Sequence, residues 1–206
     1  ALYLGSAGVG HVTVVDDDTV DMTNLQRQVA HTMDRVGSPK VRSIQAAIAQ
    51  LNPGVEVTAI QQRADAELLS QLVARFDVVL DCCDNFATRH AINAACVAHQ
   101  KPLVSGAAIR FDGQVSVFDA RDALSPCYAC VFPPEATFEE TRCATMGVFA
   151  PLTGMVGPLQ AGEAIRLLLG TPSPLASKLV LFDAGAMEWQ TMKVPKDPGC
   201  PVCGRG

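Results

Sequence analysis

Four of the eight cysteines have the spacing of a metal-binding site. Cys127 and Cys130 form one C-x-x-C pair and Cys200 and Cys203 a second, each beside proline or glycine. Two such pairs provide four thiolates, which is the ligand set of a closed structural zinc site. A redox dithiol is the competing interpretation, and the second pair favours zinc. The long gap between the pairs predicts a clip that joins the chain's end to its middle.

The other cysteines divide into two kinds. Cys82, Cys83 and Cys96 lie in apolar runs and are predicted to be small buried hydrophobic residues. Cys143 lies beside an arginine at the end of the polar, proline-marked stretch 133–142, which is predicted to be a mobile loop. A thiol next to a cation can ionise and react, so a reactive and a structural role are equally open for Cys143.

Polar residues with the chemistry of a nucleotide site follow the apolar run 11–15. Asp16, the first of three consecutive aspartates, is placed to bind ribose hydroxyls if that run is a strand of a Rossmann-like unit, and a solvated acidic loop is the alternative. Asn24 and Arg27 come next. Lys40 is expected in the first turn of a helix, where the helix dipole disfavours a cation, so this lysine is predicted to be held for a phosphate.

Asp84 and Asn85 come shortly after another apolar run, 78–80, which is predicted to be a buried strand. Ligands of open α/β sheets bind at the carboxyl ends of the strands, although an aspartate or asparagine there can also be a helix N-cap. Together with Arg27 and Lys40, these residues suit a nucleoside triphosphate with its magnesium better than a dinucleotide.

The elements that must position these residues alternate between strand and helix. Ser38 and Pro39 are predicted to start one helix, with Leu51 among its inward-facing residues, and Asp112-Gly113 is predicted to be a hairpin turn. The predicted strands are 11–15, 55–60, 78–80, 103–109, 114–118, 178–182 and 189–194, and the predicted helices are 39–51, 68–76, 87–99 and 148–169. This order predicts a Rossmann-like parallel sheet that continues into a mixed half, with helices on both faces.

Composition limits the class of protein. The 206 residues, 49% hydrophobic, suit one domain, with a nucleotide-binding half (1–101) and a mixed-sheet half that contains the predicted zinc site (102–206). A net charge of -5 argues against nucleic acid as a partner. The apolar stretch 148–170 contains Gln160, Glu163 and Arg166, which indicates a buried amphipathic helix and no membrane span. No secretory signal opens the chain, so a cytoplasmic location with reduced thiols is expected.

Several motifs together resemble one family. The chain is similar from its first residues to its last to the prokaryotic relatives of ubiquitin-activating enzymes, which are the molybdopterin-synthase and thiamine-thiazole sulfur-carrier adenylyltransferases. Val104-Ser-Gly-Ala-Ala-Ile-Arg110 with Gly113-Gln114 looks more like the molybdopterin branch. The motifs, besides the C-x-x-C pairs, are His11-Val-Thr-Val-Val-Asp16, Asn24-Leu-Gln-Arg-Gln28, Pro39-Lys40, Leu80-Asp-Cys-Cys-Asp-Asn85 and Gly157-Pro-Leu-Gln-Ala-Gly-Glu-Ala-Ile165.

The resemblance implies ATP-dependent adenylation of the carboxyl-terminal glycine of a ubiquitin-like sulfur carrier. Asn24, Arg27 and Lys40 would stabilise the triphosphate, Asp84 would bind Mg²⁺, and Cys143 matches a loop cysteine with a possible covalent or sulfur-transfer role. Asp16 would hold the ribose, and Thr23 and Asn85 complete the implied nucleotide-binding set. The implied cofactors are ATP with Mg²⁺ and structural Zn²⁺. The implied partners are a carrier ending in Gly-Gly, a second copy of the chain in a homodimer, and a separate sulfurtransferase.

The chain departs from the family at its start. Family members open with a first strand and a glycine-rich phosphate loop, whereas Gly5, Gly8 and Gly10 precede a strand, so the natural polypeptide is expected to begin earlier. Two rival functions remain. One is an NAD-dependent oxidoreductase on the same kind of sheet, and the other is a non-catalytic, zinc-stabilised module that binds a ubiquitin-like protein.

Overall fold

The computed structural model describes residues 1–135 and 147–204, in two compact units, Ala1–Ala64 and Asp65–Gly206. The prediction of a single domain whose halves meet near residue 101 therefore stays a prediction. Cys143 and most of the loop predicted over 133–142 lie outside the described residues.

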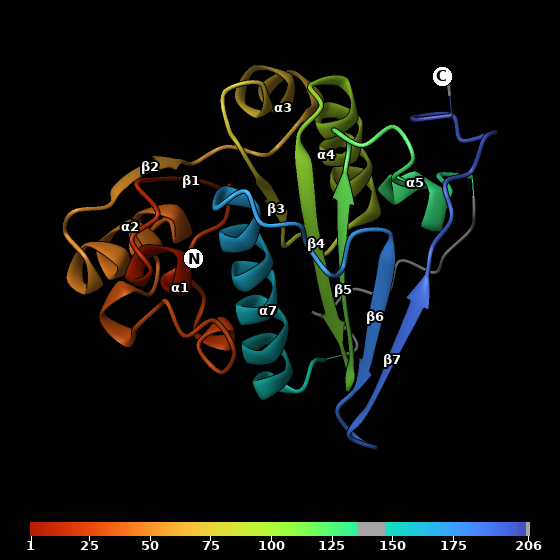
Figure 1. Cartoon of the computed structure of the whole chain (residues 1–206). Coiled ribbons are helices and arrows are strands. Elements are labelled where there is room, and N and C mark those ends of the chain that lie inside the picture. The colour runs from red at the N-terminus through yellow and green to blue at the C-terminus, as the bar shows by residue number, and fades with distance from the viewer. Residues whose placement is uncertain (136–146, 205–206) are drawn as a thin grey trace. The chain divides into compact units, whose positions relative to one another are not determined.

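The amino-terminal unit contains a parallel pair of strands joined by a helix (Figure 1). Strand β1 (His11–Val15) pairs in parallel with β2 (Glu56–Ile60), as predicted. Helix α2 (Lys40–Leu51) buries Val41 and Ile48 completely, and Ile48 packs so closely on Gly5 that a Cβ there would lie 2.7 Å from Ile48 Cγ2. The other elements are α1 (Leu2–Ser6) and two 3-10 turns, η1 (Met22–Asn24) and η2 (Met33–Arg35).

The start and the inner face of α2 differ from the prediction. Pro39, not Ser38, is the N-cap, and no side chain caps the helix. The backbone N–H of Lys40 instead donates to the carbonyl of Asp18 at 3.0 Å, so an incoming loop satisfies this helix end. Leu51, predicted to face inward, is 54% exposed because the helix ends there.

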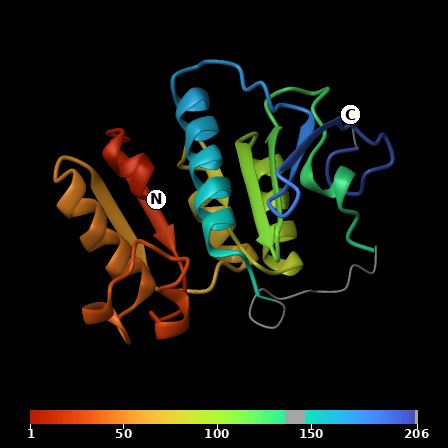
Figure 2. The same cartoon turned by 90° about the horizontal axis from the view of Figure 1, so that it is seen from below.

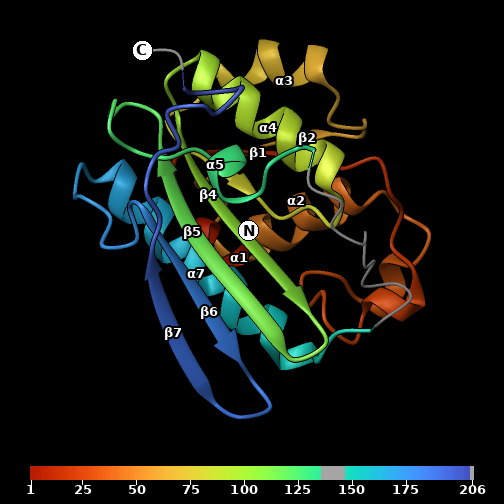
Figure 3. The ribbon, with the colours of Figure 1, turned by 90° about the vertical axis from the view of Figure 1, so that its right-hand side faces the viewer.

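The carboxyl-terminal unit is built on a five-stranded mixed sheet in the order β3-β4-β5-β6-β7. Figure 3 shows β4, β5, β6 and β7 side by side. Strands β3 and β4 are parallel, and the other neighbours are antiparallel. The predicted change from parallel to mixed pairing is confirmed. The strands are β3 (Val79–Asp81), β4 (Pro102–Ile109), β5 (Asp112–Asp119), β6 (Lys178–Asp183) and β7 (Glu188–Lys193).

Helices cover both faces of this sheet. Helix α7 (Ala150–Leu168) packs on one face of β3, β4 and β5, and α4 (Phe86–Ala98) lies on the other (Figure 2). Helix α3 (Ala66–Val73) packs on α4, and the short helix α5 (Tyr128–Val131) follows β5. Hydrogen bonds among the described residues define two sheets, the parallel pair and the mixed sheet, and their continuity stays a prediction.

The hairpin between β4 and β5 turns earlier than predicted. Ile109 pairs with Asp112, so the loop residues are Arg110, with φ of 49°, and Phe111. Gly113 lies inside β5, where a Cβ would stand 2.9 Å from Leu152 Cδ1. The prediction of an Asp112-Gly113 turn is wrong because this glycine makes room for α7.

Helix α7 turns polar residues toward the interior. Gln160 and Glu163, which argued against a membrane span in the sequence, are both buried. Glu163 accepts a hydrogen bond from the Ser173 hydroxyl. No helix in the described part of the chain is long and apolar enough to cross a membrane.

Candidate functional site

Lys40 begins α2, as predicted, and its ammonium group meets the aspartates that follow β1. Lys40 Nζ lies 2.7 Å from Asp18 Oδ2, and the two side chains are 10% and 66% exposed. Asp16 follows the last residue of β1, and its carboxylate accepts the backbone N–H of Asp18 at 2.9 Å. Burial raises the pKa of Asp16, an effect that this hydrogen bond and Lys40 oppose. Asp16 and Lys40 are therefore held together through Asp18.

Thr23, Asn24 and Arg27 lie in one capped turn. Asp21 caps η1 by accepting the N–H and the hydroxyl of Thr23, and Asn24 Oδ1 accepts the N–H of Asp21 at 3.2 Å. Arg27 donates from Nη1 to the carbonyl of Thr23 at 3.2 Å. The amide and guanidinium groups predicted for a phosphate site are thus fixed on one short segment.

A buried histidine, which the sequence analysis missed, connects that segment to α2. His31 Nδ1 lies 2.9 Å from Ser43 Oγ, one turn after Lys40. Burial lowers the pKa of His31, and the charges of Lys40 and Arg35 lower it further. The histidine is therefore held neutral, and its ring ties the chain that follows Arg27 to the helix that carries Lys40.

Asp84 lies in the carboxyl-terminal unit, in the turn between β3 and α4. Its side chain is exposed and makes no hydrogen bond or ion pair with the described residues. Asn85, the next residue, is the N-cap of α4 and accepts the N–H of Thr88 at 2.9 Å. The predicted cap role falls to Asn85, which leaves the Asp84 carboxylate available to a ligand.

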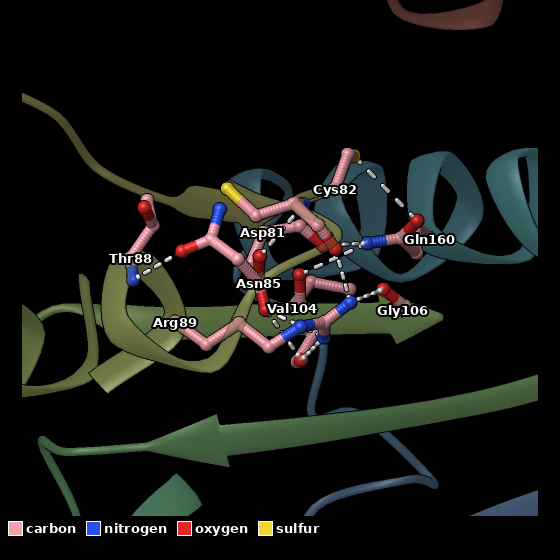
Figure 4. A network of polar contacts seen from close by, with 10 residues as sticks. Asp81, Cys82, Asn85, Thr88, Arg89, Val104, Gly106 and Gln160 are labelled. Atoms are coloured by element: carbon pink, nitrogen blue, oxygen red, sulfur yellow. Dashed lines mark hydrogen bonds and ion pairs between the residues drawn. The ribbon is translucent and has the colours of Figure 1, made fainter. Parts of the chain in front are cut away.

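Arg89 holds this turn from the side of α4 (Figure 4). Its Nη1 lies 3.0 Å from Asp81 Oδ2, in a pair that is buried on both sides. Its Nη2 donates to the carbonyls of Cys83 and Gly106. Asp81 in turn accepts the Ser105 hydroxyl at 2.8 Å and the N–H of Cys83 at 2.9 Å. The charge of Asp81 is thus compensated, and the backbone just before Asp84 is fixed.

Gln160 holds the same turn from the side of α7 (Figure 4). Its Nε2 donates to the carbonyls of Asp81 and Val104, at 2.7 and 3.2 Å, where β3 and β4 run side by side. Gly106 makes room for this side chain, because a Cβ there would lie 2.3 Å from Gln160 Cδ. Arg89 and Gln160 thus clamp the end of β3 from opposite faces of the sheet.

The four paired cysteines converge on one point. Cys127 Sγ lies 3.7 Å from Cys200 Sγ and 4.0 Å from Cys130 Sγ, and Cys130 Sγ lies 3.4 Å from Cys203 Sγ. All four sulfurs lie within 4.8 Å of one another. Sulfurs bound tetrahedrally to one zinc ion at about 2.3 Å would be about 3.8 Å apart, whereas a disulfide needs about 2.05 Å. The cluster fits a zinc ion and contains no disulfide.

The electrostatics of the cluster are those of thiols removed from water. Burial raises the pKa of Cys127, and the side-chain hydrogen bond from Asn93 opposes this effect. Burial acts to raise the pKa of Cys200 as well, but hydrogen bonds from the backbone of Cys203 and Val202 and from the side chains of Cys127 and Cys130 together lower that pKa. Backbone donors around Cys200 therefore favour the thiolate, which is the form that binds metal.

Comparison with known proteins decides the family. The ThiF family model matches residues 1–202. The chain belongs to the ThiF family. It is 46% identical over 205 residues to an Escherichia coli protein named molybdopterin-synthase adenylyltransferase, covering 98% of this chain and 81% of that protein. It is also 46% identical over 209 residues to the E. coli sulfur carrier protein ThiS adenylyltransferase, covering 99% of this chain and 80% of that protein.

The fold of this ThiF-family chain also occurs in a solved structure of E. coli MccB with ATP. The two superpose with a TM-score of 0.84 at 21% sequence identity. The match covers 98% of this chain and spans 62% of the MccB chain. At this identity the likeness establishes the fold alone.

Three cysteines outside the cluster of this ThiF-family chain test another prediction. Cys96 is buried, as predicted, whereas Cys83 is half-buried and Cys82 is exposed. The prediction is wrong for Cys82 because the chain leaves the sheet after Asp81, so Cys82 no longer lies in a strand. Its sulfur lies 3.7 Å from Gln160 Oε1.

Proposed function

We propose that this chain activates a ubiquitin-like sulfur carrier by adenylating its carboxyl-terminal glycine. A carboxylate oxygen of that glycine attacks the α-phosphorus of ATP, the bond from this phosphorus to the bridging oxygen breaks, and pyrophosphate leaves. The observation that carries the proposal is the match, over nearly all of this chain, to proteins named molybdopterin-synthase adenylyltransferase and sulfur carrier protein ThiS adenylyltransferase. The nucleophile is already ionised, so no general base is required, and the protein contributes positioning and charge.

The Lys40 and Asp18 pair supports a phosphate role for Lys40. The ammonium group is buried, whereas the carboxylate that it meets is largely exposed. A phosphate oxygen can take the place of that exposed carboxylate without moving Lys40 out of its buried position. Arg27 and Asn24 would contribute further donors to the triphosphate, and Asp16 would accept hydrogen bonds from the ribose hydroxyls.

Asp84 supports a magnesium role because its carboxylate has no partner among the described residues and lies in a rigid turn. Mg²⁺ in nucleotide enzymes is commonly bound by one or two carboxylates together with the phosphates. The turn that carries Asp84 is fixed through Asp81, Cys83 and Asn85. Bound Mg²⁺ would neutralise charge that develops on the departing phosphates.

The partner and cofactor assignments complete the proposal. Zinc at the four cysteines would stabilise the fold, because four thiolates leave no open coordination position. The carrier would end in Gly-Gly, and its sulfur would come from a separate sulfurtransferase. We propose a cytoplasmic homodimer, with Cys143 acting in sulfur transfer after adenylation. The molybdopterin-synthase type of carrier is favoured by the motif Val104-Ser-Gly-Ala-Ala-Ile-Arg110.

The test is exchange of labelled pyrophosphate into ATP, measured on the full-length protein with each of the two carrier types. We expect exchange that depends on a carrier with an intact Gly-Gly end.

Asp84→Asn should reduce the exchange rate at least about 100-fold by removing a metal ligand of the transition state. Asp77→Asn is the matched control, because Asp77 is an exposed aspartate at the other end of β3, and it should retain the parent rate.

The outcomes separate the candidate functions. Exchange with neither carrier would reject adenylation, and carrier binding without exchange would favour the non-catalytic module. Exchange that survives Asp84→Asn would keep the function and remove Asp84 from the mechanism. NADH binding in the absence of exchange would favour the oxidoreductase.

A further inference from the structure

We propose that Asn93 is a positioning residue of the four-cysteine site, whose side-chain amide donates to the Cys127 sulfur and orients it toward the metal. This inference rests on zinc binding by the cysteines and is independent of adenylation. Asn93 lies in α4 and is 1% exposed, so water cannot satisfy its amide group.

The direction of the amide follows from its two contacts. Asn93 Oδ1 lies 2.9 Å from the backbone nitrogen of Tyr128, and Nδ2 lies 3.5 Å from Cys127 Sγ. A backbone N–H can only donate, so the amide oxygen must face Tyr128. The NH₂ group is thereby turned toward the sulfur. The side chain is thus a donor to Cys127, and its orientation is fixed by the residue that follows this cysteine.

A donor at this position has a clear effect on a metal site. A cysteine bound to zinc is a thiolate that keeps negative charge, and a buried thiolate without donors is costly. Groups that hydrogen-bond to metal ligands fix their orientation, and their loss typically weakens metal binding about 10- to 100-fold. Among the described residues, Asn93 is the side-chain amide that reaches the cluster, because the other hydrogen-bond contacts of these sulfurs are to one another or to the backbone.

The same residue ties the cluster to the turn that presents Asp84. Asn85, Arg89 and Asn93 are spaced by four residues and therefore lie along one side of α4. Asn85 caps the helix behind Asp84, Arg89 clamps the backbone of Cys83, and Asn93 reaches Cys127. A single helix thus positions both sites.

The experiment measures metal affinity in the full-length protein. Asn93→Asp keeps the acceptor for Tyr128 but places an oxygen against the sulfur, whereas Asn93→Leu removes both contacts at similar volume. We expect Asn93→Asp to weaken zinc binding at least about 10-fold in competition with a chelator, and to shift the thiolate-to-metal absorption of the cobalt-loaded protein. Asn52→Asp makes the same chemical change in residues 1–64, and should leave the affinity and the spectrum unchanged.

An unchanged affinity and spectrum in a folded Asn93→Asp protein would overturn the proposal. If that variant does not fold, the unaltered protein decides. Loaded with the NMR-active isotope of cadmium, it should show scalar coupling between the metal and a side-chain amide proton of Asn93. Absence of this coupling in the loaded protein would overturn the proposal, as would failure of the unaltered protein to bind zinc or cadmium.

Discussion

Single buried polar residues hold the segments that carry the proposed ligands. His31, Arg89, Asn93 and Gln160 are each buried, and each bonds to a residue in another element. A buried polar group without a partner costs about 1–3 kcal/mol, so each of these contacts resists displacement. Such residues act on function by holding backbone and side chains still.

His31 allows this idea to be tested by pH. Its pKa is lowered from 6.5 in the fold, so the folded state resists a proton that the unfolded chain accepts. The contribution of His31 to the free energy of unfolding should therefore be constant above about pH 6.5 and should fall as the pH decreases toward the folded pKa, by at most about 1.4 kcal/mol per pH unit. His31→Gln should flatten this dependence in denaturant unfolding.

Comparison of the parent protein with His31→Gln isolates the contribution of His31 to the pH dependence. His90, whose pKa burial also lowers, is present in both, so its contribution cancels. An equal slope in the parent and in His31→Gln would show that the ring is not held neutral. Ser43→Ala, which removes the partner hydroxyl, should lower stability while preserving the pH dependence that burial causes.

At the residue scale, the sequence predicted ligands whose neighbours are local and missed those whose partners are distant. The positions of Asp16, Lys40 and Asn85 at the end of a strand or the start of a helix were predicted correctly, while their roles as ligands stay predictions. Gln160 donates to the carbonyl of Asp81, which is 79 positions away. Arg89 pairs with the carboxylate of the same Asp81, which in the sequence stands between apolar residues. No local pattern reports such pairings.

At the scale of elements, two helices fix the end of one short strand. β3 has only three residues, yet α4 contacts its last residue through Arg89 and α7 does so through Gln160. Gly106, in the neighbouring strand β4, allows Gln160 to approach. The turn that carries Asp84 is consequently as rigid as the packing of the helices on either face.

Gly106→Ala tests this arrangement. The added Cβ would lie 2.3 Å from Gln160 Cδ, which would displace an amide that donates to two strand carbonyls. We expect a loss of about 1–3 kcal/mol in the free energy of unfolding, as is typical of overpacking. Gly162→Ala, in an open position of α7, should be neutral or stabilising by up to about 1 kcal/mol. Denaturant unfolding measures both.

The double variant Gly106→Ala with Gln160→Ala gives the decisive comparison. Truncation of Gln160 vacates the space that the new methyl group needs, so the combined loss should be smaller than the sum of the two single losses. Additive losses would mean that the two residues do not compete for space.

The sequence predicted most elements and misjudged the points where packing decides. Alternating strands and helices were found because periodicity and β-branched runs are local signals. Gly113 was assigned to a turn because an Asp-Gly dipeptide commonly makes one, whereas in the fold it makes room for Leu152. Ser38 was predicted to be the N-cap of α2, but the carbonyl of Asp18 in an incoming loop satisfies this helix end instead.

At the scale of the whole carboxyl-terminal unit, the cysteine cluster closes a long loop. Cys127 and Cys200 are 73 residues apart, and the segment between them contains α7, β6 and β7. Cys127 and Cys200 also form a small apolar cluster with Ala129, which Val97 of α4 joins. The sequence predicted this clip because two C-x-x-C pairs are a specific signal even without knowledge of the fold.

If the four cysteines bind zinc as proposed, removal of the metal should destabilise this unit by the entropy of the released loop. Closing a loop of about 70 residues is worth on the order of 4 kcal/mol when estimated as for a disulfide. A chelator should therefore lower the unfolding temperature of the purified protein in a calorimetric scan, and restoring zinc should reverse the change.

Cys200→Ser should unfold at the lower temperature with or without chelator, because three thiolates no longer close the site. Cys82→Ser, which changes a cysteine outside the cluster, should respond to the chelator as the parent does. The contrary result would be a parent protein that loses its bound zinc without a change in unfolding temperature. In that case packing around Ala129 and Val97 holds the ends of the loop together without the metal.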